Sequence, residues 1–428
     1  MLPAPEQDSA LGMEYYVTDT PGCGGILRSD PADFQVKEVY EDLKYEGGRY
    51  LVLEIEKKDW DTHHLIRELA RRLRISQKRF GWAGTKDKRA VTSQRISIMN
   101  LDESELKRIT LPDINIKVLG KTNRAVGLGD LLGNRFKIHI QKLTCADAKS
   151  RMEKITDEIN ARGIPNYFGV QRFGDVRPVT HKVGEALAKG DIEGAVFTYI
   201  ALPFPGEPET TRKARQQLWE SRDIPAALRT FPDYLRYEVA MLNYLVEHPG
   251  DFAGSFNVLT PNLRLLFIHA YQSYLFNRIL SRRLVLGLPL EKATEGDIVC
   301  FSKGDMPDLS RIQAATEDNI EAINRLAGRG RAYVTLPLVG YESTLAEGRE
   351  GNIERAVLNE ENVDMEGFRV PENTNLGSKG TRRAALLRVS PAANVKGECA
   401  EVEFFLPAGS YATVVLREYM KSGSIKAE

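Results

Sequence analysis

The hydrophobic periodicity of the chain changes near residue 175, and this change most constrains the fold. Up to that point, several segments alternate apolar and polar residues, which predicts strands at 33–39, 49–58, 114–119 and 135–140. From about 175 to 285, helical patterns separated by prolines dominate, and the strongest covers 263–284. Strand patterns return at 332–340 and near the C-terminus. Because 428 residues exceed one ordinary hydrophobic core, two or three domains are expected.

An aspartate lies in a basic loop between two of the predicted strands. A helix is expected to begin at Asp61 or Thr62, since apolar residues follow at helical spacing, and its other face carries four arginines, including Arg67 and Arg71. A short strand near 80–83 and a strand at 91–98 then enclose the loop GTKDKRA, which contains Asp87. Loops held by a sheet often carry active groups, so Asp87 is a candidate.

The charge of the chain is unevenly distributed, although its formal total is zero. Residues 57–95 hold 12 Lys and Arg against 4 Asp and Glu, a local balance of +8. Salt screens charges beyond roughly 10 Å, so the local balance decides whether a polyanion is attracted. A basic zone of this kind is typical of proteins that contact phosphates. From charge alone, a helix face that is simply exposed to solvent is an equally good interpretation.

The sequence contains no motif that indicates a metal site, a nucleotide-binding loop or a serine-type nucleophile. The four cysteines show no metal-ligand spacing, and the adjacent His63 and His64 point to different sides of a helix. No nucleotide-binding loop or nucleophile elbow is present, so neither a metal nor an organic cofactor is expected. The N-terminus does not resemble a signal peptide and no apolar run has membrane-spanning length, which predicts a cytoplasmic protein without membrane contact.

Six stretches resemble the TruD family of pseudouridine synthases, and they occur in the family's order. The signature stretch is GWAGTKDKRAVTSQ at 81–94. The others are ILRSDPADFQVKE (26–38), GLGDLLGNRFKI (127–138), GIPNYFGVQRFG (163–174), HAYQSYLFN (269–277) and FFLPAGSYATVVLRE (404–418). The resemblance implies an α+β fold, in which a catalytic domain with a mixed, mostly antiparallel sheet is interrupted by an inserted, helix-rich α/β domain. The expected boundaries are 1–174 plus 385–428 for the catalytic domain and 175–384 for the insertion.

The resemblance also implies a reaction and a partner. A TruD enzyme isomerises a uridine of tRNA, at position 13 in the D arm, to pseudouridine. It breaks the bond from uracil N1 to ribose C1′ and rejoins the base through C5, so no redox cofactor or metal is required. The expected partner is therefore tRNA, and the oligomeric state is left open, with a monomer as the simplest case.

Matching positions in the family motifs assign roles to individual residues. Asp87 is the expected catalytic carboxylate, and whether it attacks C1′, attacks C6 or assists a glycal route stays open. Arg28 is its expected basic partner. The expected substrate-binding residues are Phe168, which would stack on a flipped base, Asn166, Phe34 and Gln94, and the expected RNA-backbone residues are Lys86, Lys88, Arg67 and Arg71.

Other interpretations of these residues remain open. By local context alone, Arg28 is a surface charge, Phe168 a core residue and Asn166 a turn former. One alternative function is an RNA-binding or remodelling protein of the same fold without catalysis. A second is a hydrolase that uses Asp87 to cleave a glycosidic bond. Such an enzyme normally needs a second carboxyl group as the acid, and the motifs contain none.

Overall fold

The computed structural model describes residues 1–106, 109–304, 306–370 and 376–422. The chain forms two compact units. The first comprises Met1–Leu2, Tyr16–Ile164 and the chain from Arg388 onward, and the second comprises Pro3–Tyr15 and Pro165–Leu387. None of the helices in these ranges combines the length and apolarity needed to cross a lipid bilayer.

The first unit is built on a sheet that contains nine strands within the described residues. The central order is β14-β15-β7-β2-β5-β3-β6, with β1 on β7 and β4 on β5. Among the described pairs, β2 runs parallel to β5 and the others are antiparallel. The strands are β1 (Ile26–Leu27), β2 (Phe34–Val39), β3 (Tyr50–Lys58), β4 (Phe80–Trp82), β5 (Val91–Met99), β6 (Ile114–Thr122), β7 (Gly133–Gln141), β14 (Ala392–Lys396) and β15 (Cys399–Pro407). The expected mixed, mostly antiparallel sheet is confirmed.

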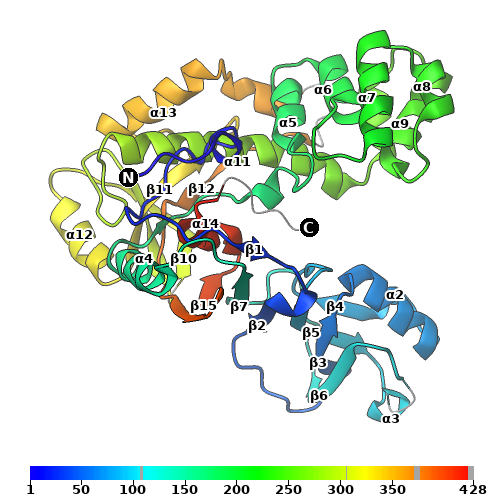
Figure 1. The fold of residues 1–428 in the computed structure, drawn as a ribbon, viewed down its shortest axis with the longest axis horizontal. Coiled ribbons are helices and arrows are strands. Elements are labelled where there is room, and N and C mark those ends of the chain that lie inside the picture. The colour runs from blue at the N-terminus through cyan, green and yellow to red at the C-terminus, as the bar shows by residue number, and fades with distance from the viewer. Residues whose placement is uncertain (107–108, 305, 371–375, 423–428) are drawn as a thin grey trace. The chain divides into compact units, whose positions relative to one another are not determined.

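One face of this sheet is apolar and packs against a helix. Leu53 and Ile55 of β3 and Ile96 of β5 form a core with the buried side of α2 (Thr62–Leu73), which lies beside these strands in Figure 1. Asp61 is the N-cap, since its carboxylate accepts a bond from the main-chain N–H of the third residue of the turn. The other helices of this unit are α3 (Glu103–Leu106), α4 (Ala148–Arg162) and α14 (Ala412–Met420).

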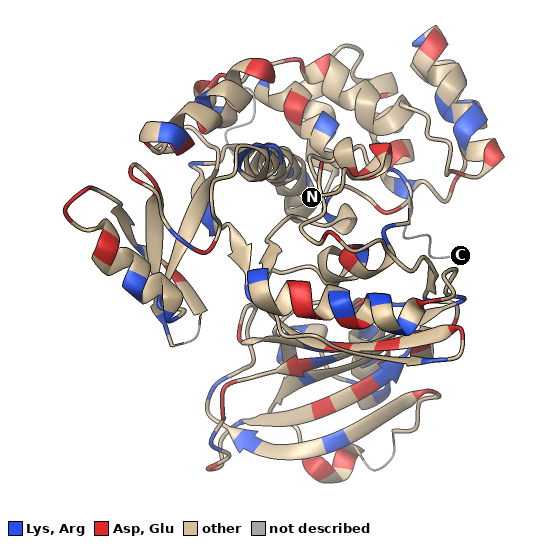
Figure 2. Cartoon of the chain, turned by 60° about the vertical axis from the view of Figure 1, so that its left-hand side comes forward, with Lys and Arg blue, Asp and Glu red and all other residues tan. Residues whose placement is uncertain are grey.

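The opposite face of the same sheet is mostly polar, apart from a small apolar cluster around Val52. Alternate residues of β3, such as Glu54, point there, and Lys37 Nζ of β2 pairs with Glu54 Oε1 at 3.0 Å. Figure 2 shows that the strands of this sheet carry both acidic and basic residues. The period-two pattern that predicted the strands arises from this division into an apolar and a polar face.

The second unit is mostly helical and contains a four-stranded sheet of order β10-β9-β11-β12 in its described part. Its strands are β9 (Ile298–Lys303), β10 (Met306–Ala314), β11 (Ala332–Leu338) and β12 (Thr381–Ala384). The shorter β8 (Ile164–Pro165) and β13 (Leu386–Leu387) pair with each other and fall where the chain passes from one unit to the other in the sequence. The helices are α1 (Glu6–Ser9), α5 (Thr180–Ala188), α6 (Ile192–Ala201), α7 (Glu209–Ser221), α8 (Ile224–Thr230), α9 (Arg236–Glu247), α10 (Phe252–Ser255), α11 (Pro261–Val285), α12 (Ile320–Gly328) and α13 (Gly348–Glu360).

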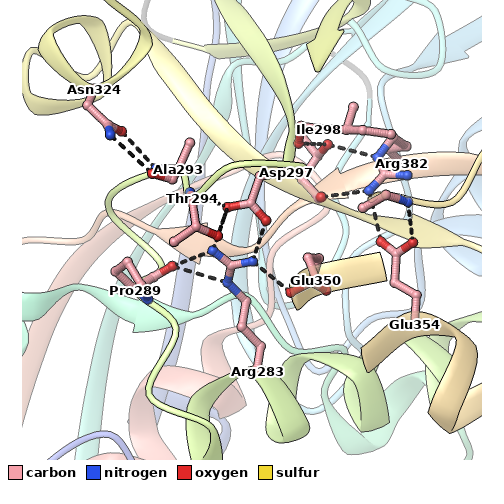
Figure 3. A network of polar contacts seen from close by, with 12 residues as sticks. Arg283, Pro289, Ala293, Thr294, Asp297, Ile298, Asn324, Glu350, Glu354 and Arg382 are labelled. Carbon is pink, nitrogen blue, oxygen red and sulfur yellow. Dashed lines mark hydrogen bonds and ion pairs between the residues drawn. The ribbon is translucent and has the colours of Figure 1, made fainter. Parts of the chain in front are cut away.

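A buried ionic network joins helices and strands of the second unit (Figure 3). Arg283 of α11 is fully buried and donates to both carboxylate oxygens of Asp297, at 2.7 and 2.9 Å, and to Glu350 of α13 at 2.7 Å. Arg382 of β12 donates to Glu354 at 3.1 Å. Burial raises the pKa of Glu350 to about 7, because the Arg283 charge offsets only part of the desolvation.

Candidate active site

Asp87 lies on the loop between β4 and β5, as predicted, and its carboxylate is paired. Arg28 Nη2 donates to Asp87 Oδ2 at 2.6 Å, and the two residues are 59 positions apart. The Asp87 side chain is 53% exposed, whereas that of Arg28 is only 15% exposed. In this pair the carboxylate is therefore accessible to solvent, whereas the guanidinium that holds it is largely buried.

Two features fix the guanidinium of Arg28. Its carbon lies 4.2 Å from the centroid of the Phe34 ring, so the cation stacks on an aromatic face at the start of β2. The main chain of Arg28 has φ +59°, a left-handed conformation uncommon for a side chain of this size. Arg28 directly follows β1 in the chain. The structure thus brings Arg28, Phe34 and Asp87 together.

A second set of hydrogen bonds anchors the main chain of the loop that carries Asp87. The hydroxyl of Thr62, at the start of α2, accepts the Lys86 main-chain N–H at 3.0 Å and donates to Gln94 Oε1 at 3.0 Å. Gln94 Nε2 donates to the carbonyl of Gly84 at 3.3 Å. Gln94 is 1% exposed and faces the loop from β5. The sequence did not single out Thr62 beyond its possible role as a helix cap.

The two lysines beside Asp87 have different surroundings. Lys86 Nζ lies 2.6 Å from Glu38 Oε1 of β2, and the side chains are 9% and 0% exposed. Burial raises the pKa of Glu38, and the neighbouring Lys86 opposes that rise. Lys88 is exposed to solvent. Lys86 therefore makes a contact within the fold, whereas Lys88 is accessible to a ligand.

The exposed side of α2 carries arginines around a shallow hollow of about 940 Å³. Arg67 and Arg71 are both exposed and line it. Glu68 accepts hydrogen bonds from Arg71 and Arg72, at 2.6 and 2.7 Å, which lower its pKa to about 2. Three arginines and two acids, Asp61 and Glu68, line the hollow, so its charge is slightly basic, and Glu68 is already paired with two cations.

Asn166 and Phe168 belong to the second unit, where an arginine contacts both. Arg383 of β12 donates to Asn166 Oδ1 at 2.6 Å and to its carbonyl at 3.1 Å, and its guanidinium carbon lies 4.2 Å from the Phe168 ring centroid. Asn166 Nδ2 donates to the carbonyl of Ala384 at 2.9 Å. The main-chain N–H of Phe168 bonds to Asn277 Oδ1 of α11 at 2.9 Å. Sequence analysis did not identify Arg383, which lies outside the six motifs and 217 positions from Asn166.

The described residues contain no cluster of three or more His, Cys, Asp or Glu side chains arranged to hold a metal ion. The chemistry that this site offers comes from one exposed carboxylate, a guanidinium and several surrounding cations. Such a set can act as a nucleophile or a base on an anionic substrate.

Comparisons with known proteins agree over nearly the whole chain. The family model described as tRNA pseudouridine synthase D (TruD) matches residues 10–419. A Methanosarcina barkeri protein with the name "Probable tRNA pseudouridine synthase D" is 48% identical, over 98% of each chain. A Halobacterium salinarum protein of the same name is 41% identical, over 97% of each. A crystal structure of a Methanosarcina mazei protein, also named for tRNA pseudouridine synthase D, superposes with a TM-score of 0.88 at 48% identity and covers 98% of this chain and 99% of its own.

The mixed sheet and the structural agreement place the chain among the α+β pseudouridine synthase folds. Within this class, the chain belongs to the TruD family of tRNA pseudouridine synthases.

Proposed function

We propose that this protein isomerises the uridine at position 13 of the tRNA D arm to pseudouridine, with Asp87 as the reacting carboxylate. The observation that carries this proposal is the exposed Asp87 carboxylate, held at 2.6 Å by the largely covered Arg28. In the reaction the N1–C1′ bond breaks, the base turns and the C5–C1′ bond forms; the proton on C5 then leaves, and N1 gains a proton. The products balance the substrate atom for atom, so the protein needs to supply only nucleophilic and acid–base groups.

Arg28 orients Asp87 in this proposal, and the cations around the loop bind the RNA backbone. Arg28 is stacked on Phe34 and therefore loses little further freedom when it holds the carboxylate. Lys88, Arg67 and Arg71 are exposed and suited to phosphate contacts, which position an RNA without reading its sequence. The ion pair of Lys86 with Glu38 favours a supporting role in the loop instead.

We further propose that the target uridine flips out of the folded RNA and is held by Phe168 and Asn166. Support comes from their cluster with Arg383, which combines an aromatic ring, an amide and a guanidinium. These groups match the stacking and edge contacts that a flipped base requires. The catalytic domain is proposed to comprise 1–174 plus 385–428 with an insertion at 175–384, and the site of action is proposed to be the cytoplasm.

The direct test is tritium release from a tRNA transcript that carries [5-³H]uridine, because the reaction expels the C5 hydrogen. Wild type should release tritium, and Asp87→Asn should release none while it still binds the transcript. Asp42→Asn, a change of the same chemistry at another exposed aspartate, should behave as wild type. A transcript with U13 replaced by C should yield no release if position 13 is the target.

Other results of this assay select other functions. Tight tRNA binding without release by wild type would indicate an RNA-binding protein that lacks catalysis. Free uracil among the products would indicate a hydrolase. Equal tritium release by wild type and Asp87→Asn would support the enzymatic function and exclude Asp87 as the reacting group.

A further inference from the structure

A fully buried lysine lies beneath the Asp87 loop. Lys57 is next to the last residue of β3 and shares the apolar face of the sheet with Ile55, two positions before it. Its exposed fraction is 0%, although lysine is among the residues least often fully buried. A cation in that place must be held by specific acceptors, because desolvation of an unpaired charge is costly.

The two acceptors of Lys57 are main-chain carbonyls from different parts of the chain. Lys57 Nζ donates to the carbonyl of Asp87 itself at 3.3 Å. It also donates, through a short hydrogen bond, to the carbonyl of Trp60, in the turn that enters α2. One ammonium therefore ties the backbone of the candidate catalytic residue to the adjoining helix start. Arg28 holds the side chain of Asp87, and Lys57 holds its backbone.

The charges around Lys57 have opposing effects on its protonation. The pKa of Lys57 is lowered to about 8, chiefly by burial, and the nearby Lys86 acts in the same direction. Three carboxylates oppose this shift, namely Asp61 at the start of α2, Asp87 on the loop and Glu38 on β2. Lys57 is consequently charged at neutral pH and loses its proton under mildly alkaline conditions.

We propose that Lys57 is a positioning residue for Asp87, which fixes the main chain of the loop so that the carboxylate stays in its reacting position. This inference rests on the proposed function, since it presumes that Asp87 reacts with uridine. Lys57 does not touch the substrate, and its effect should therefore appear in the rate of the chemical step. tRNA binding should change little, because the exposed basic groups remain.

The variant that tests this is Lys57→Met, which keeps a long unbranched side chain and removes the donor. Lys58→Met is the matched control, because Lys58 is 43% exposed and pairs with Asp30 at 3.3 Å. Single-turnover tritium release should fall roughly 10²-fold in Lys57→Met, the effect expected when a reacting group is displaced by about 1 Å. The dissociation constant for the tRNA should stay within about twofold of wild type in both variants.

Three results would overturn the inference while wild type is active. These are an equal rate in Lys57→Met and Lys58→Met, a loss confined to tRNA affinity, and a wild-type rate that is flat from pH 7 to 9. The last result is decisive even if Lys57→Met does not fold. Deprotonation of Lys57 should lower the wild-type rate by roughly fivefold with a midpoint near pH 8, because a charged donor makes a hydrogen bond about twice as strong as a neutral one. If wild-type protein released no tritium from the tRNA transcript, the proposed function itself would be refuted.

Discussion

Replacement of Arg28 by methionine should separate activity from stability. The change removes the hydrogen bond to Asp87 Oδ2 and the stacked cation 4.2 Å from the Phe34 ring. It leaves a flexible apolar side chain that can still cover the same ring. The left-handed backbone of residue 28 remains in both proteins, so its strain cancels in the comparison.

The expected loss of stability is small. The Asp87 carboxylate is 53% exposed, so the ion pair is screened by water and contributes at most about 1 kcal/mol. The stacked cation adds about 0.5–1 kcal/mol. Together these give a decrease of roughly 1–2 kcal/mol in the free energy of unfolding. The rate of the chemical step should fall far more, by roughly 10²-fold, because the carboxylate is no longer held in one orientation.

Urea unfolding and single-turnover tritium release on the same preparations test this difference. Arg49→Met is a suitable control, since Arg49 is exposed and its guanidinium carbon stacks at 5.1 Å on Tyr50. Arg28→Lys should give an intermediate rate, because it keeps the charge and loses the planar fork. A rate for Arg28→Met within threefold of wild type would refute the role of Arg28. A loss of stability well above 2 kcal/mol would show that the pair is mainly structural.

Three further outcomes are expected. The pKa of Glu350 in the folded chain, about 7, exceeds its ordinary 4.5, so its protonation stabilises the fold and this stability is lost as pH rises from about 4.5 to 7. Between pH 4.5 and 8, the free energy of unfolding measured in urea should therefore fall by roughly 3 kcal/mol more in wild type than in Glu350→Gln. The same dependence of this free energy on pH in both proteins would contradict the prediction. The double variant Arg67→Gln, Arg71→Gln should bind tRNA more weakly, with a slope of log affinity against log salt reduced by roughly 1 per lost phosphate contact; an unchanged slope would exclude both residues from the RNA interface. Arg383→Met should lower single-turnover release roughly tenfold, because Asn166 loses a charged donor, and release equal to wild type would remove Arg383 from the base-binding cluster.

Much of the local structure of the first unit follows from the pattern of apolar and polar residues. Alternation predicted β2, β3, β5, β6 and β7, and helical spacing predicted α2 and α11, because an element that buries one face leaves its period in the sequence. The position of Asp87 on a loop between two strands was also predicted correctly. The short strand β14 was missed, since five residues at the end of a sheet carry too little pattern.

The contacts between distant segments are visible only in the folded chain. The parallel pairing of β2 with β5 and the insertion of β7 between β2 and β15 could not be predicted from periodicity, which describes the faces of a strand and not its neighbours. The contacts of Asp87 with Arg28 and Lys57 span 59 and 30 positions. Lys57 looks like an ordinary charged residue at the end of a strand. Its role appears only when β3, α2 and the loop pack together, because burial and the positions of the two carbonyls exist only in the folded chain.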